Sequence, residues 1–252
     1  MADLLYEVRD KVGYITFNRP EKKNALNGSM AAGLFDAIDD VRINPDVWVC
    51  LMTGSGRDFS TGHDLSWMNP EAGSGRSAED LYEYLMTTWK PTVSAINGFC
   101  LAQGVGLAFS CDIRIAADNA QLGWPHAKLG IPSTSGTCIL SRMIPFDIAM
   151  EYLYTGEFMS AQEALRLNLV NRVVPADKLL EEADHFIHTK ILPNAPLAMR
   201  AMKELAVRGR NMTFPDQVRF AGLLRTKMES SKDMKEGIAA FLEKRKPKFE
   251  GT

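Results

Sequence analysis

The chain has 252 residues, of which 46% are hydrophobic and 24% are charged, and its formal net charge at pH 7 is −2. This composition predicts a soluble globular protein with one large domain, or a domain plus an appendage, and it excludes the basic surface that nucleic-acid binding needs. No apolar run approaches the roughly 18–20 residues that span a bilayer, so no membrane partner is predicted.

The N-terminal stretch and the cysteines predict a cytoplasmic protein. Residues 1–11, MADLLYEVRDK, are acidic and lack the apolar core of a secretory signal. The cysteines show no paired spacing, and each lies in or beside an apolar run, which predicts buried free thiols in a reducing compartment rather than disulfides or metal ligands. They are Cys50, Cys100, Cys111 and Cys138.

The first half of the chain alternates predicted strands and helices. Short apolar runs bounded by turn residues predict strands at 13–17, 47–52, 92–96 and 113–116. Apolar residues at helical spacing follow Ser29 and Ser77, which can cap helices, and they predict helices to about residues 41 and 89. This alternation is typical of βαβ units and predicts an α/β fold with a mostly parallel sheet.

From about residue 146 the pattern becomes mainly helical. One short extended segment is predicted at 170–174. Helices are predicted over 146–154, 160–167, 176–190, 196–208, 216–229 and 233–244. The chain is therefore predicted to be α/β first and helical last.

Two loops of small residues follow predicted buried strands. Residues 59–65 read FSTGHDL, and residues 98–106 read GFCLAQGVG. A small-residue turn that opens a helix leaves free backbone N–H groups at the positive end of the helix dipole. Two such turns after neighbouring strands aim two N–H groups at one point, which is the geometry of an oxyanion hole. Close packing of a helix against a strand is the alternative explanation for the glycines.

Other candidate groups are isolated in the sequence. His63 and His126 lie in predicted loops, where a histidine is more often structural than catalytic. Ser133 lacks the GxSxG context of a hydrolase nucleophile, and GVGLAF lacks the context of a dinucleotide-binding motif. His185 and His188 have no third ligand nearby. No metal site and no separate cofactor are therefore predicted.

Five stretches together resemble the enoyl-CoA hydratase/isomerase superfamily, which has the crotonase fold. They are ITFNRPEKKNALN (15–27), LMTGSGRDFSTGHDL (51–65), KPTVSAINGFCLAQGVGLAFSCDIRIAADNAQLGWP (90–125), MEYLYTGEFMSAQEALRLNLVNRVV (150–174) and EGIAAFLEKRKPKF (236–249). The resemblance implies a spiral of ββα units with an acyl-CoA site over residues 1–195 and a helical trimerisation region over 196–252. It also implies a homotrimer or hexamer, with coenzyme A bound as part of the substrate.

The resemblance also implies where the site residues fall. In this family the thioester oxygen sits between two backbone N–H groups, which belong here to His63 and Gln103. The turn at Ala102-Gln103-Gly104 replaces the usual three glycines. Contacts with adenine and pantetheine fall on Ala25, Leu26, Asp64, Leu65 and Ser66, and the C-terminal helix places Phe241 and Lys244 to reach coenzyme A.

Two departures from the family pattern bear on the reaction. Hydratases of this family use two glutamates as general acid and base, and alignment on Cys111-Asp112 puts Gly106 and His126 at these positions. A glycine can neither hold water nor deliver a proton, and an imidazole replaces a carboxylate in only some roles, which argues against conventional hydration. Gly106 is expected to leave space for water or an anion. Ser133 falls near a position where relatives place an Asp or Tyr that faces the substrate.

Three functions are compatible with this pattern. The first is an acyl-CoA lyase or isomerase that stabilises a thioester enolate without the glutamate pair; decarboxylation of malonyl-type CoA esters is one such reaction, with His126 or Ser133 orienting the carboxylate. The second is a protein that binds CoA esters with little catalysis. The third is an ordinary hydratase. Catalytic roles are expected for His63, Gln103, His126 and Ser133, and Gly106 is expected in the substrate pocket.

Overall fold

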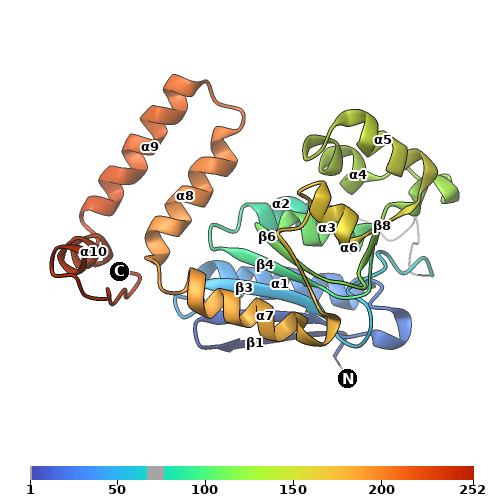
Figure 1. The fold of residues 1–252 in the computed structure, drawn as a ribbon, viewed down its shortest axis with the longest axis horizontal. Coiled ribbons are helices and arrows are strands. Elements are labelled where there is room, and N and C mark those ends of the chain that lie inside the picture. Colours follow the sequence, from blue (N-terminus) through green and yellow to red (C-terminus); the bar gives the residue numbers. More distant parts are fainter. Residues whose placement is uncertain (1, 67–76) are drawn as a thin grey trace.

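The computed structural model describes residues 2–66 and 77–252. Within these residues, the main sheet has the order β1 (Leu4–Arg9), β2 (Val12–Phe17), β3 (Val49–Gly54), β4 (Thr92–Ile96), β6 (Ile113–Ala117) and β9 (Arg172–Val174) (Figure 1). β1 and β2 pair antiparallel, and each later neighbour pairs in parallel. A second sheet holds β5 (Phe99–Leu101), β7 (Gln121–Gly123) and β8 (Phe158–Ser160). The predicted α/β fold with a mostly parallel sheet is confirmed.

Helix α1 (Gly28–Ile43) connects β2 to β3 and packs against the first hairpin. Its apolar stripe is buried, as the helical spacing predicted. Its cap is Asn27, whose side chain accepts a hydrogen bond from the Met30 N–H at 2.9 Å. The prediction of Ser29 as the cap is wrong, because the chain is already helical at that residue.

The edge strand β1 was missing from the sequence-based prediction. Its residues are mostly exposed or half-buried, since only one neighbouring strand covers them. An edge strand of this kind lacks the strict apolar alternation that identifies a half-buried strand. β5, β7 and β8 were also missed, because three-residue strands are too short to show a period.

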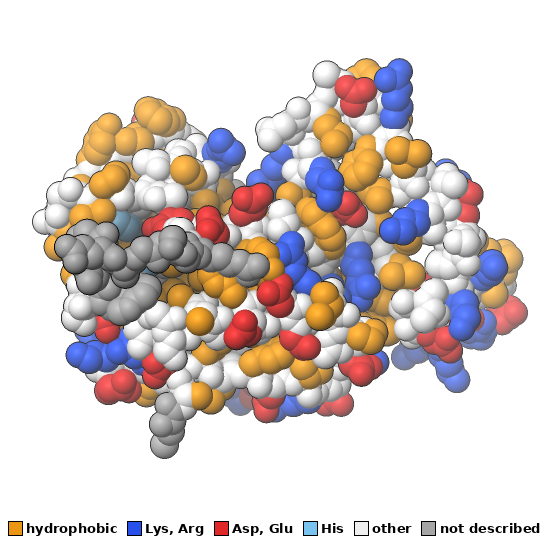
Figure 2. All heavy atoms as spheres, turned by 180° about the vertical axis from the view of Figure 1, so that it is seen from behind, with side chains coloured by type: hydrophobic (Ala, Val, Ile, Leu, Met, Phe, Trp, Pro, Cys, Tyr) orange, Lys and Arg blue, Asp and Glu red, His pale blue; other side chains and the backbone are white. Residues whose placement is uncertain are grey.

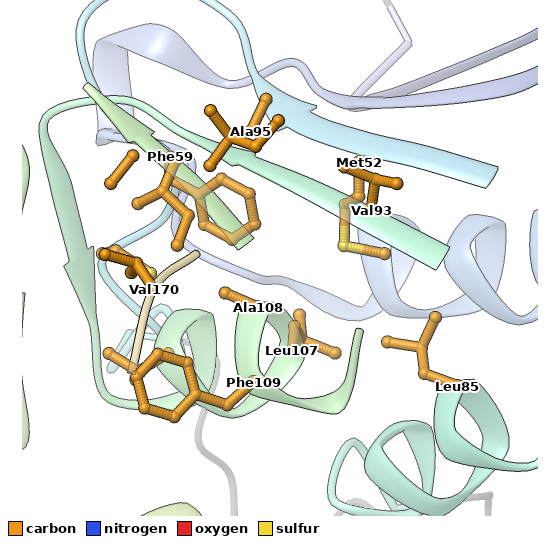
Figure 3. Packing of buried hydrophobic residues seen from close by; sticks show 14 of the residues in the cluster. Met52, Phe59, Leu85, Val93, Ala95, Leu107, Ala108, Phe109 and Val170 are labelled. Atoms are coloured by element: carbon orange, nitrogen blue, oxygen red, sulfur yellow. The ribbon is translucent and has the colours of Figure 1, made fainter. Parts of the chain in front are cut away.

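The core lies between the main sheet and helix α3 (Gln103–Ser110), which is buried along its whole length. Figure 3 shows Leu107, Ala108 and Phe109 of α3 packed among side chains of the sheet and its loops, including Val93 and Phe59. Each fully buried aliphatic or aromatic side chain of this size contributes roughly 1.5–3 kcal/mol of transfer free energy. Helix α2 (Asp80–Met86) packs on α3, so burial fixes both helices relative to the loops that open α3.

The middle of the described chain adds four short helices, the last of which packs on β4 and β6 of the main sheet. These are α4 (Thr134–Cys138), α5 (Phe146–Thr155), α6 (Ala161–Arg166) and α7 (Leu179–Phe186). Single 3-10 turns occupy Pro20–Lys22, Pro125–Leu129, Leu140–Arg142 and Ala176–Lys178, and a π-helical turn at Ile187–Ile191 continues α7. The helix predicted over 176–190 is therefore three successive helical types rather than one.

The last three helices form an arm that projects from the sheet (Figure 1). They are α8 (Pro196–Gly209), α9 (Phe214–Glu229) and α10 (Lys232–Leu242). The buried Lys203 anchors the arm, since its Nζ lies 2.8 Å from an Asp112 carboxylate oxygen and donates to the Lys90 carbonyl at 3.1 Å. The predicted division between a core up to residue 195 and a trimerisation region after it stays a prediction.

The cysteines follow the prediction with one exception. Cys50, Cys100 and Cys111 are buried free thiols. Cys138 is also free but is exposed, so its predicted burial is wrong. It ends α4, where the following Leu140 faces the core and Cys138 does not. Along residues 2–66 and 77–252, no helix combines the length and the apolar character that crossing a membrane requires.

Candidate active site

The loop after β2 and the loop after β3 are joined by a short parallel bridge between Leu26 and His63. The Leu26 N–H donates to the Gly62 carbonyl at 2.8 Å, and the Asp64 N–H donates to the Leu26 carbonyl at 2.8 Å. The Leu26 side chain lies in the core and is only 1% exposed. The backbone of Leu26, a predicted coenzyme A contact, thus fixes residues 62–64, while its side chain is anchored in the core.

The loop after β3 also pairs with the segment after β4, through a bridge between Ser60 and Cys100. Two residues further along, Gly62 has a φ of +92°, and a Cβ at this glycine would lie 2.7 Å from Ala102 Cβ and 3.0 Å from Gln103 N. Both the backbone conformation and the space require glycine here. The two small-residue loops predicted to cooperate are therefore in contact.

Ala102 has φ 52° and ψ −117°, a conformation that glycine adopts readily and other residues do not. Such strained backbone costs on the order of 1–3 kcal/mol and is concentrated at active sites and ligand clamps. Ala102 is the residue that turns the chain from β5 into α3. The strain therefore lies at the residue that orients the following N–H group.

The N–H groups of His63 and Gln103 are the two predicted donors. Gln103 is the first residue of α3, so its N–H has no partner within the helix. Among the described residues, neither N–H donates to any acceptor. The positive end of the α3 dipole adds to the attraction that Gln103 offers to an anionic oxygen.

The Gln103 side chain is held by α2 and is 3% exposed. Its Oε1 accepts a hydrogen bond from the Tyr82 hydroxyl, and its Nε2 donates to the Ala78 carbonyl at 2.6 Å. Both polar ends of this side chain are therefore paired inside the protein. The side chain therefore points to α2 and the turn before it, and the role predicted for the Gln103 backbone N–H stays a prediction.

Tyr82 occupies the side-chain space above Gly106. A Cβ on Gly106 would lie closer than 3.0 Å to the Cε1, Cζ and Oη atoms of Tyr82. The expectation that Gly106 leaves room for water or an anion is therefore wrong. A tyrosine from another helix fills the space that a side chain at residue 106 would need.

Two serines of α4 lie nearby and have different roles. Ser133 is the cap of α4, and its Oγ accepts a hydrogen bond from the Gly136 N–H at 3.0 Å. Ser135 donates from its Oγ to the Ala102 carbonyl at 3.2 Å, which braces the strained turn. The hydroxyl that contacts the turn at Ala102 thus belongs to Ser135, two residues after the predicted Ser133.

The imidazole of His63 faces a carboxylate from the start of α2. His63 Nε2 lies 3.6 Å from Glu79 Oε1, and the Ser77 hydroxyl donates to the other carboxylate oxygen. The interaction with His63 lowers the pKa of Glu79 to about 2, against the effect of partial burial. Glu79 is therefore charged at neutral pH.

His126 lies in the turn at Pro125–Leu129. Burial lowers the pKa of His126, and the neighbouring His63 lowers it further, so the His126 imidazole is neutral at pH 7. Its Nδ1 is enclosed and has no hydrogen-bond partner among the described residues. A neutral imidazole of this kind is able to accept a proton.

Arg19 organises the predicted coenzyme A contacts. One guanidinium nitrogen donates to the Ala25 carbonyl at 2.6 Å, and another lies 3.1 Å from an Asp64 carboxylate oxygen. The Ser66 hydroxyl also donates to Asp64, and this bond, followed by Arg19, lowers the pKa of Asp64. Leu65 is 57% exposed between Asp64 and Ser66. These predicted contact residues form one surface beside His63.

Comparisons with known proteins show which family the chain belongs to. The family model for enoyl-CoA hydratase/isomerase matches residues 7–252. The chain belongs to the enoyl-CoA hydratase/isomerase family. It is 38% identical over 252 residues to (E)-benzylidenesuccinyl-CoA hydratase of Thauera aromatica, covering 98% of both chains. It is 37% identical over 246 residues to a putative enoyl-CoA hydratase of Thermus thermophilus, covering 94% of this chain and 97% of the relative.

Solved structures of the family confirm the crotonase fold. A crystal structure of enoyl-CoA hydratase from Mycobacterium tuberculosis matches with a TM-score of 0.91 at 32% identity, over 100% of both chains. A crystal structure of an enoyl-CoA hydratase from Mycobacterium marinum also gives a TM-score of 0.91 at 32% identity, again over 100% of both chains.

Two predicted residues of this family member lie far from the loops. Figure 1 places α10 at the far end of the arm, away from α2 and α3. Phe241 on α10 is 83% exposed, and Lys244 follows the helix. One chain therefore does not bring Phe241 or Lys244 to His63 and Gln103, and their contact with coenzyme A stays a prediction.

Sequence reasoning missed Glu79, Tyr82 and Ser135. Glu79 is the N-cap residue of α2 and Tyr82 follows three residues later, so both lie on one side of the helix, where Glu79 meets His63 and Tyr82 meets Gln103 of α3. Helical spacing identified the buried stripe of α2 but could not show which neighbour the stripe would meet. The sequence did contain one signal: the carboxylate of Glu79 and the phenol of Tyr82 are spaced three residues apart in the helical segment that precedes the loop at 98–106.

We expect Gly106→Ala to lower the free energy of unfolding by about 1–3 kcal/mol, because the new Cβ collides with the Tyr82 ring. In a Tyr82→Leu background the same change should be neutral or stabilising by up to about 1 kcal/mol, since alanine favours a helix over glycine. Urea unfolding of the four proteins measures both effects. Equal destabilisation in the two backgrounds would contradict the packing of Tyr82 on Gly106.

Ala102→Gly should raise the free energy of unfolding by about 1 kcal/mol. Relief of roughly 1–3 kcal/mol of strain exceeds the roughly 0.5–1 kcal/mol that glycine loses through its flexibility in the unfolded chain. Ala32→Gly, the same change at an exposed position inside α1, should destabilise instead. Chemical denaturation gives both values, and a loss of stability at residue 102 as large as that at residue 32 would show that Ala102 carries no strain.

Proposed function

We propose that this member of the enoyl-CoA hydratase/isomerase family is an acyl-CoA enzyme that stabilises a thioester enolate between the N–H groups of His63 and Gln103. One observation carries the proposal: the contact of Gly62 with Ala102 and Gln103 brings together two loops that each present an unpaired amide. Preorganised amides of this kind stabilise negative charge that develops on an oxygen during a reaction.

The acyl-CoA ligand is supported by the relatives. (E)-Benzylidenesuccinyl-CoA hydratase of Thauera aromatica and 2,3-dehydroadipyl-CoA hydratase of Escherichia coli are named for CoA thioesters. The surface formed by Ala25 and residues 64–66 lies next to the amides, where the resemblance places pantetheine and adenine. Coenzyme A therefore enters as part of the substrate, and the proposal requires no separate cofactor.

Proton transfer is assigned to His126. Position 106 has no side chain, and Tyr82 fills the space above it, so the usual pair of carboxylates cannot act. His126 is neutral and lies near enough to His63 for the two imidazoles to interact electrostatically, and a neutral imidazole at the site suits removal of a proton from the α-carbon. Conventional hydration, which requires a second group to hold water, is therefore expected to be slow. Ser133 is assigned a structural role, because its hydroxyl caps the start of α4.

Decarboxylation of malonyl-type CoA esters is a second candidate. The carbon–carbon bond to the leaving carboxylate breaks, carbon dioxide departs, and the electron pair forms the enolate held by the two amides before a proton adds to the α-carbon. A carboxylate at position 106 would repel such a substrate, and Gly106 carries none. Neutral His126 then orients the leaving group.

The enolate proposal predicts that the protein exchanges the α-protons of butyryl-CoA for solvent deuterium, followed by mass spectrometry. His126→Gln should slow this exchange by about 10²–10⁴-fold, the usual contribution of a general base. His188→Gln, on the π-helical turn after α7, is the matched control and should leave the rate unchanged. Because the pKa of His126 is below its ordinary value near 6.5, the rate should be constant above about pH 6.5 and fall as acid protonates the imidazole.

Parallel assays with other thioesters separate the alternatives. Rapid hydration of crotonyl-CoA would overturn the expectation that loss of both glutamates disables this reaction. Release of carbon dioxide from methylmalonyl-CoA, lost in His126→Ala, would establish the decarboxylase. Tight binding of butyryl-CoA without exchange, hydration or decarboxylation would instead favour a CoA-ester-binding protein with little catalysis.

We further propose that the arm assembles three or six copies of the chain. Helix α9 has no buried residue within one chain, although Phe214, Val218 and Leu223 are apolar and exposed. Figure 2 shows the arm as a separate lobe with apolar side chains on its surface. A second copy that covers this helix would bury these side chains, and it would bring its own Phe241 and Lys244 toward a neighbouring site.

Light scattering after gel filtration should give about 84 kDa or about twice that mass, for three or six chains of 28.0 kDa. Phe214→Asp with Leu223→Asp should shift the mass toward one chain, because burial of two carboxylates in an apolar interface is unfavourable. Ile43→Asp, at an equally exposed position on α1, should leave the assembly intact. A 28 kDa particle for the unaltered protein would contradict the proposal.

A further inference from the structure

Tyr82 connects the two residues that form the strained turn at the start of α3. It is buried, and its ring covers Gly106 one turn into the helix. Its hydroxyl donates to the side chain of Gln103. The phenol also interacts with the hydroxyl of Ser135, which donates to the carbonyl of Ala102. The phenol therefore contacts both the Gln103 side chain and the Ser135 hydroxyl that holds the Ala102 carbonyl.

The Gln103 side chain is fixed at two points, by α2 and by the turn before it. Its oxygen accepts from Tyr82 of α2, and its nitrogen donates to the Ala78 carbonyl at 2.6 Å, in the turn that precedes the helix. An amide paired at both ends has a single orientation, and here it is buried, so rotation would leave a donor or an acceptor without a partner. The backbone of Gln103, which carries the proposed oxyanion-hole N–H, is restrained by this pairing.

The Tyr82 phenol stays protonated, as a hydrogen-bond donor to Gln103 must be. Burial raises the pKa of Tyr82, so the hydroxyl keeps its proton and remains a donor throughout the neutral range. Glycine at position 102 would turn the chain without strain, whereas Ala102 has to be held in an unfavourable conformation. The Tyr82–Gln103 pair supplies a restraint that this turn needs.

We propose that Tyr82 is a positioning residue that holds the Gln103 N–H in line with the thioester oxygen, and so sets how strongly the site polarises an acyl-CoA. The proposal rests on the proposed function, because it assumes that the His63 and Gln103 amides bind that oxygen. Tyr82 acts through Gln103 and has no assigned contact with substrate. It also explains why position 106 is glycine, since the ring needs that space.

Tyr82→Phe keeps the ring over Gly106 and removes only the hydroxyl. The matched control is Tyr84→Phe on the same helix, where the hydroxyl donates to Asp39 of α1 instead. The carbonyl stretch of bound [1-¹³C]butyryl-CoA, measured by isotope-edited infrared spectroscopy, falls in frequency as the carbonyl accepts stronger hydrogen bonds. Folding of each variant is checked by thermal unfolding, so a general loss of stability is distinguished from a local one.

We expect Tyr82→Phe to reduce the infrared shift and to slow α-proton exchange by about 10-fold or more, a partial loss of one oxyanion-hole donor, with little change in KM. Tyr84→Phe should match the unaltered protein in both readouts even where its melting temperature falls. Gln103→Met, which removes the acceptor of the bond, should reproduce Tyr82→Phe. The double variant should be no worse than the worse single variant, because the two side chains act as one unit.

Two failures are distinguishable. No infrared shift in the unaltered protein means that the two amides do not polarise the thioester, and the proposed function falls. A normal shift and normal exchange in both Tyr82→Phe and Gln103→Met mean that the hole is rigid without the phenol, and the role of Tyr82 is overturned. If Tyr82→Phe does not fold, Gln103→Met and its infrared spectrum decide the question alone.

Discussion

The close approach of Gly62 to Ala102 and Gln103 is the constraint on which the site depends. Parallel pairing of β3 with β4 brings the loops after them to one edge of the sheet, but only a residue without Cβ lets them touch. Both residues that meet in this contact, Gly62 and Ala102, have a positive φ. A side chain at residue 62 would separate the amides of 63 and 103 before any catalytic group is considered.

Position 106 and Tyr82 form one arrangement rather than two independent features. The family pattern suggested that a glycine at residue 106 leaves a gap, yet the gap is occupied by a ring from α2. Restoring a carboxylate there would require removal of Tyr82, which would also release Gln103. Membership of the family accounts for the fold and the loops of this chain, whereas the side chain that fills the space at residue 106 comes from α2, outside the glycine-rich motif.

The features that could be predicted from the sequence are those that depend on neighbouring residues, and the features that were missed depend on contacts between distant segments. Strand β4 was predicted within its observed bounds, because five consecutive buried residues between Pro91 and Asn97 are a local signal. The two loops were predicted from glycines that a tight turn needs. The contact between Tyr82 and Gln103 was not, since it depends on how α2 packs on α3. Ala102 gave no signal, because an alanine does not show in sequence that its φ is positive.

The charges around the site constrain how an enolate can be stabilised. Glu79 is ionised and near the site, so it would oppose a second negative charge unless its field were compensated. One of its oxygens faces the His63 imidazole, and the other accepts a hydrogen bond from the Ser77 hydroxyl. His126 is neutral and supplies no compensating positive charge. In the proposed reaction, stabilisation of the enolate is therefore assigned to fixed dipoles, namely the two N–H groups and the start of α3, and dipoles act strongly only when they are held in place.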